Sequence, residues 1–330
     1  FFFPSLDEAV GASLLISLRL MAFIWASSPS GGCFFGAGAS GGAETLALDF
    51  TSPQGVSATL LYTVYPECDV ITRRLRVRND GAAPVTLEKA MSYQLDLPGC
   101  GYTLATLNGA WARERHVVET PLTVGAHAFG STAGVSSAFC NPFFFLFAQD
   151  ANEFAGDVYG FNLIYSGSHA ACVEVSPWGK TRVAAGLQPE GFSWTLAPDE
   201  AFETPEAVLT FSRSGKNGMS ANLHAFVREH IVRGKWAKKD RPVLLNNWEA
   251  TYFDFTERRL VGLAKDAARL GAELFVLDDG WFGARDNDAK GLGDYAVNRK
   301  KLPGGLAGLV EKVHGLGMLF GLWFEPEMVN

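Results

Sequence analysis

Apolar and polar positions alternate along much of the chain, from about residue 44 to about residue 210. In PVTLEKAMSYQLDLPG, residues 84–99, the apolar side chains fall mainly on odd positions: Val85, Leu87, Met91, Tyr93, Leu95 and Leu97. A period of two is typical of a β-strand with one buried face. RRLRVRND, residues 73–80, has the same period and ends in a turn sequence. Many such runs, separated by Gly, Pro and Asn, predict a large antiparallel β-sandwich.

The period changes near residue 219. MSANLHAFVREHIVRG, residues 219–234, has Ser220 as a candidate N-cap and Gly234 as a stop. Between them lies an apolar stripe at helical spacing: Leu223, Phe226, Val227 and Ile231. A capped stripe with this spacing predicts an amphipathic helix. We interpret residues 218–240 as a connecting helix followed by a joint between domains.

Strand and helix patterns alternate in the last part of the chain. Short apolar runs predict three strands, at residues 243–248, 273–279 and 318–327. Thr256 is the candidate cap of the first intervening helix, and the second helix ends near Gly317. Apolar strands separated by helices predict a parallel sheet covered on both faces. The order matches the first three β-α steps of a (β/α)8 (TIM) barrel, which needs eight to close.

These patterns divide the chain into four parts. Residues 44–217 form the sandwich domain, residues 218–240 the connecting helix and joint, and residues 241–330 the incomplete barrel. Residues 1–43 stay unassigned, because an apolar stretch and a Gly- and Ser-rich stretch predict no element there. The apolar stretch, residues 14–26, is too short to span a bilayer, so we expect no membrane association.

Composition narrows the class of protein further. The chain has 28 basic and 35 acidic residues, and its net charge of −7 disfavours a nucleic-acid partner. The cysteines are scattered and form no C-x-x-C pair: Cys33, Cys68, Cys100, Cys140 and Cys172. This spacing disfavours a disulfide framework and a zinc site, and it favours the cytoplasm. The histidines show no ligand spacing either, so we expect no metal and no cofactor.

All three predicted strands end in residues that suit a sugar. They are Trp248 and Glu249 at the end of the first strand, Asp278 and Asp279 at the end of the second, and Trp323, Glu325 and Glu327 on the third. Because the carboxyl ends of barrel strands lie on one face, we expect these side chains to converge. Carboxylates accept hydrogen bonds from vicinal hydroxyls, and an indole can cover the C–H face of a pyranose. A divalent cation held by Asp278, Asp279 and Glu325 is the less favoured alternative.

Each of these residues also has a purely structural interpretation. Asp278, Asp279 and Gly280 form a common turn sequence, in which one carboxylate could cap the next element. Trp248 could be a core residue, since tryptophan is buried on average. If instead both aspartates face a sugar, they repel each other in the empty site. Replacing either one by alanine should then cost little stability.

Longer motifs resemble one enzyme family. NNWEATYFDFTE, LDDGWFG and GLWFEPEMV occur in this order in the last third of the chain. LNGAWARERH, GFNLIYSGS, TPEAVLTFS and MSANLHAFVREHI precede them. These segments resemble glycoside hydrolase family 36, the retaining α-galactosidases or melibiases. The resemblance runs from about residue 44 to residue 330 and implies a β-supersandwich followed by a catalytic (β/α)8 barrel.

The resemblance also implies roles for individual residues. Asp278 and Asp279 match aspartates that hold galactose hydroxyls, Trp248 a pocket wall, and Trp323 a residue near the sugar. Trp111 matches a sandwich tryptophan that reaches the substrate at subunit contacts in tetrameric members, although its charged surroundings also fit a solvated strand end. Glu325 and Glu327 are expected to orient other groups. The family's nucleophile and acid/base are aspartates in segments further along the barrel, so no catalytic residue is expected within this chain.

The expected function is hydrolysis of terminal α-galactosyl residues from melibiose and raffinose-type oligosaccharides. The complete enzyme would use a retaining double displacement and would be a homo-oligomer, a tetramer. This chain would supply the sugar-binding part of the pocket and be inactive alone. Two alternatives stay open: an α-N-acetylgalactosaminidase, and a non-catalytic carbohydrate-binding module formed by the sandwich.

Overall fold

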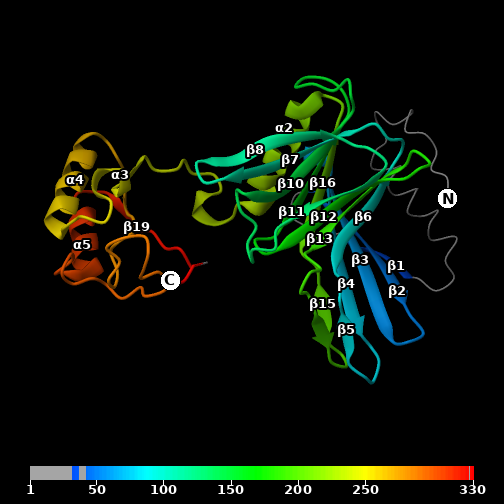
Figure 1. The fold of residues 1–330 in the computed structure, drawn as a ribbon, viewed down its shortest axis with the longest axis horizontal. Helices are drawn as coiled ribbons and strands as arrows, with labels where there is room; N and C mark the ends of the chain where they lie inside the picture. Colours follow the sequence, from blue (N-terminus) through cyan, green and yellow to red (C-terminus); the bar gives the residue numbers. More distant parts are fainter. Residues whose placement is uncertain (1–31, 37–41, 327) are drawn as a thin grey trace. The chain divides into compact units, whose positions relative to one another are not determined.

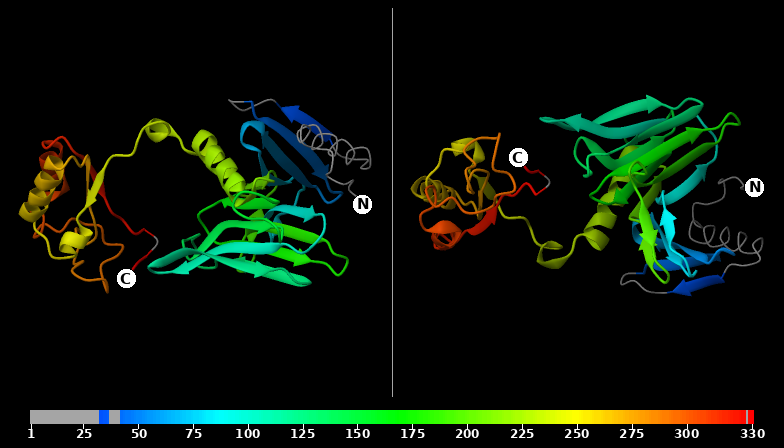
Figure 2. Two further views of the ribbon diagram at one scale, coloured as in Figure 1. Left: turned by 90° about the horizontal axis from the view of Figure 1, so that it is seen from above. Right: turned by 60° about the horizontal axis from the view of Figure 1, so that its bottom comes forward.

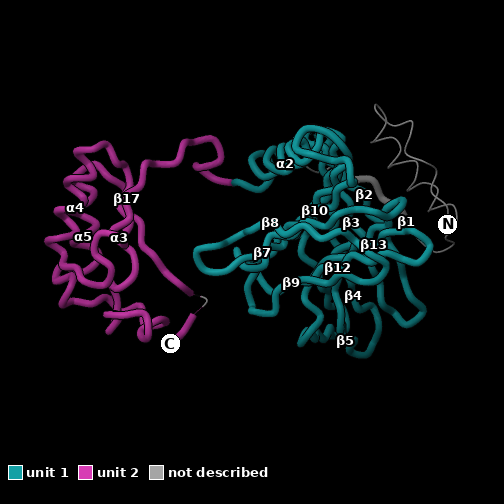
Figure 3. The backbone as a smooth tube through the Cα atoms, turned by 45° about the horizontal axis from the view of Figure 1, so that its top comes forward, with its two compact units in different colours: residues 1–232 teal, residues 233–330 magenta. Residues whose placement is uncertain are grey.

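The computed structural model describes residues 32–36, 42–326 and 328–330 (Figure 1). The chain forms two compact units, Phe1–Val232 and Arg233–Asn330 (Figure 3). The apolar stretch at residues 14–26 and Glu327 lie outside the described residues. None of the described helices is long and apolar enough to cross a membrane.

Antiparallel strands build the first unit (Figure 2). Its ten-stranded sheet has the order β1 (Gly32–Gly36), β2 (Glu44–Thr51), β3 (Val56–Tyr65), β4 (Val70–Asn79), β16 (Glu206–Ser212), β11 (Val158–Ile164), β10 (Cys140–Phe147), β7 (Thr103–Ala110) and β8 (Arg113–Pro121), with β15 (Ala201–Glu203) also paired to β4. A four-stranded sheet has the order β6 (Met91–Leu97), β13 (Thr181–Leu187), β12 (His169–Val175) and β9 (Gly125–Gly130). A two-stranded ribbon pairs β14 (Trp194–Leu196) with β5 (Val85–Leu87).

One apolar core joins the two larger sheets. Phe144 of β10 and Phe161 of β11 stack with ring centroids 5.0 Å apart. Tyr93 of β6 stacks on Phe161 from the smaller sheet at 5.9 Å. Val173 and Val183, on β12 and β13, are fully buried in the same cluster. Two sheets that share a core in this way form a β-sandwich, which confirms the prediction from alternation.

Two strand assignments differ from the sequence prediction. The alternating run 85–97 is two strands rather than one, because β5 pairs with β14 whereas β6 pairs with β13. The chain therefore leaves one pairing and enters another at residues 88–90. In addition, β1 precedes the first predicted element, and its pairing with β2 rather than any periodicity defines it.

The connecting helix begins earlier than predicted. Helix α2 spans Gly215–Phe226 and continues as a π-turn, η2 (Val227–Ile231), so Ser220 lies inside the helix and is not its cap. The first helical N–H groups find backbone acceptors in a neighbouring loop instead. Lys216 N donates to Asn152 O at 3.0 Å, and Asn217 N donates to Glu153 O at 3.0 Å. This contact between distant segments leaves no signature in the local sequence.

Parallel strands and helices alternate in the second unit, as predicted. Its elements are β17 (Leu244–Asn246), α3 (Trp248–Thr251), α4 (Glu257–Arg269), β18 (Leu274–Leu277), α5 (Gly305–His314) and β19 (Leu319–Leu322). The three strands pair in parallel in the order β17-β18-β19. The Thr256 hydroxyl accepts a hydrogen bond from Arg259 N at 3.4 Å, which confirms Thr256 as the cap of α4.

The prediction of a sheet covered on both faces is wrong for the described residues. Leu260 of α4 and Leu309 of α5 enter one buried cluster with Phe275 and Leu277, which share one face of β18. Both helices therefore pack against the same face. Residues on the other face of β18 are only partly buried, and Leu319 at the start of β19 is 44% exposed. Successive crossovers of one hand that add strands in one direction place all helices on one side.

Candidate functional site

The end of β17 supports the end of β18 through two asparagines. Asn247 is buried, and its side-chain oxygen accepts a hydrogen bond from Asp278 N at 2.8 Å. The side chain of Asn246 donates to Asp278 Oδ2, and its oxygen accepts from Trp248 N at 2.7 Å. The pair Asn246–Asn247 thus fixes both the backbone and the carboxylate of Asp278.

Asp278 keeps part of its hydrogen-bonding capacity. Its Oδ2 accepts from Asn246, and its Oδ1 accepts from Asp279 N at 2.7 Å. An ionised carboxylate offers about four acceptor positions, so about two positions of Asp278 are not used by these bonds. The residue is partly exposed. Asp278 is therefore oriented by the protein and can still accept hydrogen bonds from a ligand.

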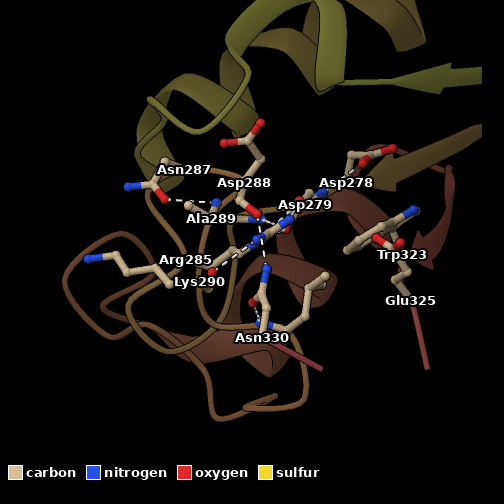
Figure 4. A network of polar contacts seen from close by, with 12 residues as sticks. Asp278, Asp279, Arg285, Asn287, Asp288, Ala289, Lys290, Trp323, Glu325 and Asn330 are labelled. Carbon is tan, nitrogen blue, oxygen red and sulfur yellow. Dashed lines mark hydrogen bonds and ion pairs between the residues drawn. The ribbon is translucent and has the colours of Figure 1, made fainter. Parts of the chain in front are cut away.

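Asp279 is committed to a buried ion pair. Arg285 Nη2 donates to Asp279 Oδ2 at 2.8 Å, and Arg285 Nε donates to Oδ1 at 3.0 Å (Figure 4). Gly280 N donates to Oδ1 at 2.6 Å. Asp279 is 5% exposed and Arg285 is 3% exposed. The carboxylate of Asp279 raises the pKa of Arg285, chiefly through these hydrogen bonds.

This pair changes the expectation of simple repulsion between the two aspartates. A guanidinium with two parallel hydrogen bonds compensates the charge of Asp279. Removing one partner of a buried pair leaves an uncompensated charge, which is strongly destabilising. The ion pair contradicts the basis of the expectation that alanine costs little stability at either position, and for Asp279 we expect a loss instead. The expectation still applies to Asp278.

Lys301 ties the loop after β18 together. Its ammonium donates to Phe253 O and Gly280 O, each at 2.9 Å, and to Arg285 O at 3.2 Å. It also forms an ion pair with Asp286 at 2.9 Å, and this contact lowers the pKa of Asp286. One cation thus holds the backbone on both sides of the Asp279–Arg285 pair.

The end of β19 lies next to this network (Figure 4). Trp323 N donates to Leu277 O at 2.9 Å, so Trp323 directly adjoins the end of β18. Tyr295 OH donates to Glu325 O at 2.8 Å. Glu325 lies close enough for its charge to add to the raised pKa of Arg285. A cation site on these carboxylates is disfavoured, because a guanidinium already engages Asp279.

The three tryptophans have different surroundings. Trp248 is partly buried and packs edge-to-face on Tyr252 and Phe253, with ring centroids 5.2 Å and 5.0 Å away. Trp323 is also partly buried and packs against the core of its unit. Trp111 belongs to the first unit, in the turn between β7 and β8, and is 86% exposed. The structure therefore gathers Asp278, Asp279 and Trp323 at neighbouring strand ends, with Trp248 at the start of α3, two residues after the last residue of β17.

Local sequence patterns do not mark the residues that orient these groups. Arg285 and Lys301 lie in the long segment between β18 and α5, where no periodicity marks buried positions. Asn246 and Asn247 were visible only as polar residues at the end of a strand. A useful signal is an adjacent pair of carboxylates after a buried strand, which calls for a nearby cation when either carboxylate is buried.

The sequence of this chain matches two known protein-family models. The melibiase family matches residues 201–330, and the N-terminal domain of glycosyl hydrolase family 36 matches residues 33–197. Alpha-galactosidase AgaA of Geobacillus stearothermophilus is 49% identical over 276 residues, which cover 84% of this chain and 38% of AgaA. Alpha-galactosidase Mel36A of Lactobacillus acidophilus is 46% identical over 271 residues, covering 82% of this chain and 37% of Mel36A.

Solved structures of α-galactosidases are also similar to this chain. The crystal structure of AgaA superposes with a TM-score of 0.86 and 45% identity, covering 92% of this chain and 44% of that chain. An AgaA variant in complex with raffinose gives a TM-score of 0.85 and 44% identity, with the same coverage. The chain thus spans well under half the length of these relatives. All of them are named α-galactosidases, which favours neither of the two alternatives left open by the sequence.

Proposed function

Because the chain belongs to glycoside hydrolase family 36, we propose that it forms the sugar-orienting part of an α-galactosidase. The activity is hydrolysis of terminal α-galactosyl residues from α-galactosides. Structures of AgaA variants contain raffinose and stachyose, which supports this class of oligosaccharide, and the family resemblance adds melibiose. The galactoside is the proposed partner. The four cysteines with described surroundings are free thiols, which supports a cytoplasmic location.

The second unit is proposed to be the start of a (β/α)8 barrel. Its three strands are parallel, in sequence order, and covered by helices on one face. In a barrel the helices form the outer ring and the opposite face of each strand points into the barrel. The partly buried opposite face of β18 supports this arrangement. We propose residues 44–217 and 241–330 as the two domains, joined by residues 218–240.

One observation carries the proposal: an oriented carboxylate with unused acceptor positions at the carboxyl end of a parallel strand. Asp278 is held by Asn246 and Asn247 and keeps room for hydroxyl donors. Asp279, locked by Arg285, lies beside it. We propose that the two aspartates hold neighbouring galactose hydroxyls, with the larger share on Asp278. Trp323 and Trp248 are proposed to line the same pocket.

The chemistry is proposed to be a retaining double displacement. A carboxylate attacks the anomeric carbon, a second carboxyl group protonates the leaving oxygen, and water then hydrolyses the covalent intermediate. The resemblance assigns both groups to aspartates outside these 330 residues. This chain contributes positioning: it fixes hydroxyls so that the reacting atoms meet in the productive geometry. The 330-residue chain alone should therefore not hydrolyse p-nitrophenyl α-galactoside.

Exchange of segments with a relative tests this proposal. A chimaera would carry residues 44–330 of this chain in place of the matching segment of AgaA. It should hydrolyse p-nitrophenyl α-galactoside and raffinose, whereas the isolated chain should not. A chimaera that folds, as judged by a cooperative melt, but lacks turnover would contradict the proposed role. Turnover by the isolated chain would show that the catalytic groups lie within it.

Assembly into a tetramer is proposed through the β7–β8 arm. Trp111 at its turn is 86% exposed, and every residue of β8 is exposed along the sheet edge. An exposed tryptophan next to an exposed edge strand supports a contact with another subunit. Trp111→Ala in the chimaera should reduce assembly, measured by light scattering, and should lower kcat/KM for raffinose. Unchanged assembly and kinetics would contradict this role.

A further inference from the structure

Three metal-type donors from distant parts of the sequence meet on the sandwich unit. Glu67 and Cys68 lie in the single-turn helix η1 (Pro66–Cys68), and His230 lies in η2. A carboxylate oxygen, the Cys68 sulfur and a ring nitrogen of His230 all lie within 4.8 Å of one another. We propose that Glu67, Cys68 and His230 form a zinc-binding site.

The donor set suits Zn²⁺. This ion accepts thiolate, imidazole and carboxylate ligands, usually in a tetrahedron, and water can fill a fourth position. Its bond lengths of about 2.0–2.3 Å place neighbouring ligand atoms roughly 3.3–3.8 Å apart. His230 Nε2 and Glu67 Oε1 are now 2.6 Å apart, so they would separate by about 0.7 Å. Glu67 can make this adjustment because its side chain is 41% exposed.

The electrostatic environment of the thiol favours a cation. The Cys68 thiol is buried, and the carboxylates of Glu67 and Asp69 lie close enough to act on it through their charge. In the folded chain the thiol therefore sits among negative charges with only a weak acceptor, Tyr65 O at 3.7 Å. A divalent ion would stabilise the thiolate, since metal binding requires and drives its deprotonation.

Local backbone geometry brings the three donors together. The last turn of the connecting helix is a π-turn, closed by Val232 N donating to Val227 O at 2.9 Å. Such turns are rare and occur often at functional sites. The His230 ring packs 4.5 Å from the Tyr65 ring and 5.5 Å from the Phe226 ring, which restricts its orientation toward Glu67. The sequence showed no ligand spacing because His230 lies far along the chain from the Glu67–Cys68 pair.

A metal at this position would fasten the end of the connecting helix to the sandwich. Residues 227–231 precede the boundary between the two units, after Val232. Apart from the aromatic contacts, the His230 side chain makes one hydrogen-bonded pair with the described residues, to the partly exposed Glu67. A bound ion would replace this pair by three coordinate bonds. The proposal concerns this helix end alone and does not depend on the galactosidase activity.

Cobalt titration of the purified, metal-stripped chain tests the site. Co²⁺ should bind in one equivalent and give a thiolate-to-cobalt charge-transfer band with the visible bands of a tetrahedral ion. Zn²⁺ should displace it. Cys68→Ser should abolish the charge-transfer band, whereas Cys100→Ser, which changes an exposed thiol, should keep it. Absence of the band in the unaltered chain, or its persistence in Cys68→Ser, would overturn the proposal.

A second variant covers the case in which Cys68→Ser fails to fold. Glu67→Gln can still accept a hydrogen bond from His230 but is a poor zinc ligand. Its melting temperature in a chelator should match that of the unaltered chain, whereas its affinity for Zn²⁺ should fall by about 100-fold or more. The rise in melting temperature on adding Zn²⁺ should shrink accordingly. Equal zinc-dependent stabilisation in both proteins would show that the Glu67–His230 contact is only a hydrogen bond.

Discussion

The two units place their charged side chains in different environments. In the sandwich unit, Arg182 and Asp96 pair across neighbouring strands, with side chains 50% and 45% exposed. In the β/α unit, the pair formed by Arg285 and Asp279 has side chains 4% and 8% exposed. Both arginines donate two parallel hydrogen bonds to a carboxylate. The chemistry is the same, and only burial differs.

The burial of each ion pair depends on where its sheet places polar residues. Polar residues on the open face of an antiparallel sheet meet cross-strand partners in water. The carboxyl ends of parallel strands instead collect polar residues at one edge, beneath the following loops. A carboxylate enclosed there needs a partner supplied by the fold. The site is therefore the region in which single charge changes should have the largest effect.

Removing Arg285 should give the largest loss of stability. Arg285→Ala leaves the Asp279 carboxylate buried without a cation, which costs about 3–5 kcal/mol. The measurement is urea denaturation of the 330-residue chain, followed by tryptophan fluorescence, to which buried Trp281 of the same unit contributes.

Arg182→Ala is the matched control from the sandwich unit. It removes an exposed pair with similar geometry and should cost about 0–1 kcal/mol. If both variants lost the same free energy of unfolding, burial would not distinguish the ion pairs of the two units. Rescue of Arg285→Ala by adding Asp279→Asn would show that the uncompensated charge causes the loss.

Alanine at the two adjacent aspartates should also have different effects, because only Asp279 is buried in an ion pair. In the AgaA chimaera, Asp278→Ala should lower kcat/KM for raffinose by about tenfold to a hundredfold, since a hydrogen bond to a charged group contributes about 1.5–3 kcal/mol. Its melting temperature should change little. Asp279→Ala should lower the melting temperature strongly, because Arg285 is left buried and unpaired. Full activity of Asp278→Ala would show that the Asp278–Asp279 pair is only a structural turn.

Local patterns predicted the elements that carry the site. The three strands, the Thr256 cap and the helices α4 and α5 of the β/α unit follow from periodicity and capping residues. The positions of Asp278 and Trp323 at strand ends follow from the same reasoning. These features depend on interactions between residues close in sequence.

Features that depend on distant contacts could not be predicted. The start of α2 at Gly215 rests on the carbonyl groups of Asn152 and Glu153, and the neutralisation of Asp279 rests on Arg285 in an aperiodic loop. The one-sided covering of the parallel sheet depends on the hand of two successive crossovers. In each case the deciding partner lies in a different element, so no local pattern records it.

Two glycines, one on a strand of the first unit and one on a helix of the second, should respond to the same substitution with opposite signs. Gly160 on β11 faces α2, and a Cβ there would lie 2.8 Å from Met219 Sδ and 2.9 Å from Thr210 Cγ2. Gly160→Ala should destabilise the sandwich unit by about 1–3 kcal/mol through overpacking. Gly262 lies on the exposed face of α4, and a Cβ there meets nothing within 4 Å.

Gly262→Ala should therefore stabilise the β/α unit by about 0.5–1 kcal/mol, because alanine loses less backbone entropy than glycine in a helix. Hydrogen exchange resolved by segment measures both effects in the same chain: protection of β11 and α2 should fall in one variant, and protection of α4 should rise in the other. Gly160→Ala should cost less stability in a Met219→Ala background than in the unaltered chain, since the clashing sulfur is then absent. A loss of protection in both units from either single variant would show that the two units unfold together, and the comparison between them would then not be separable by mutation.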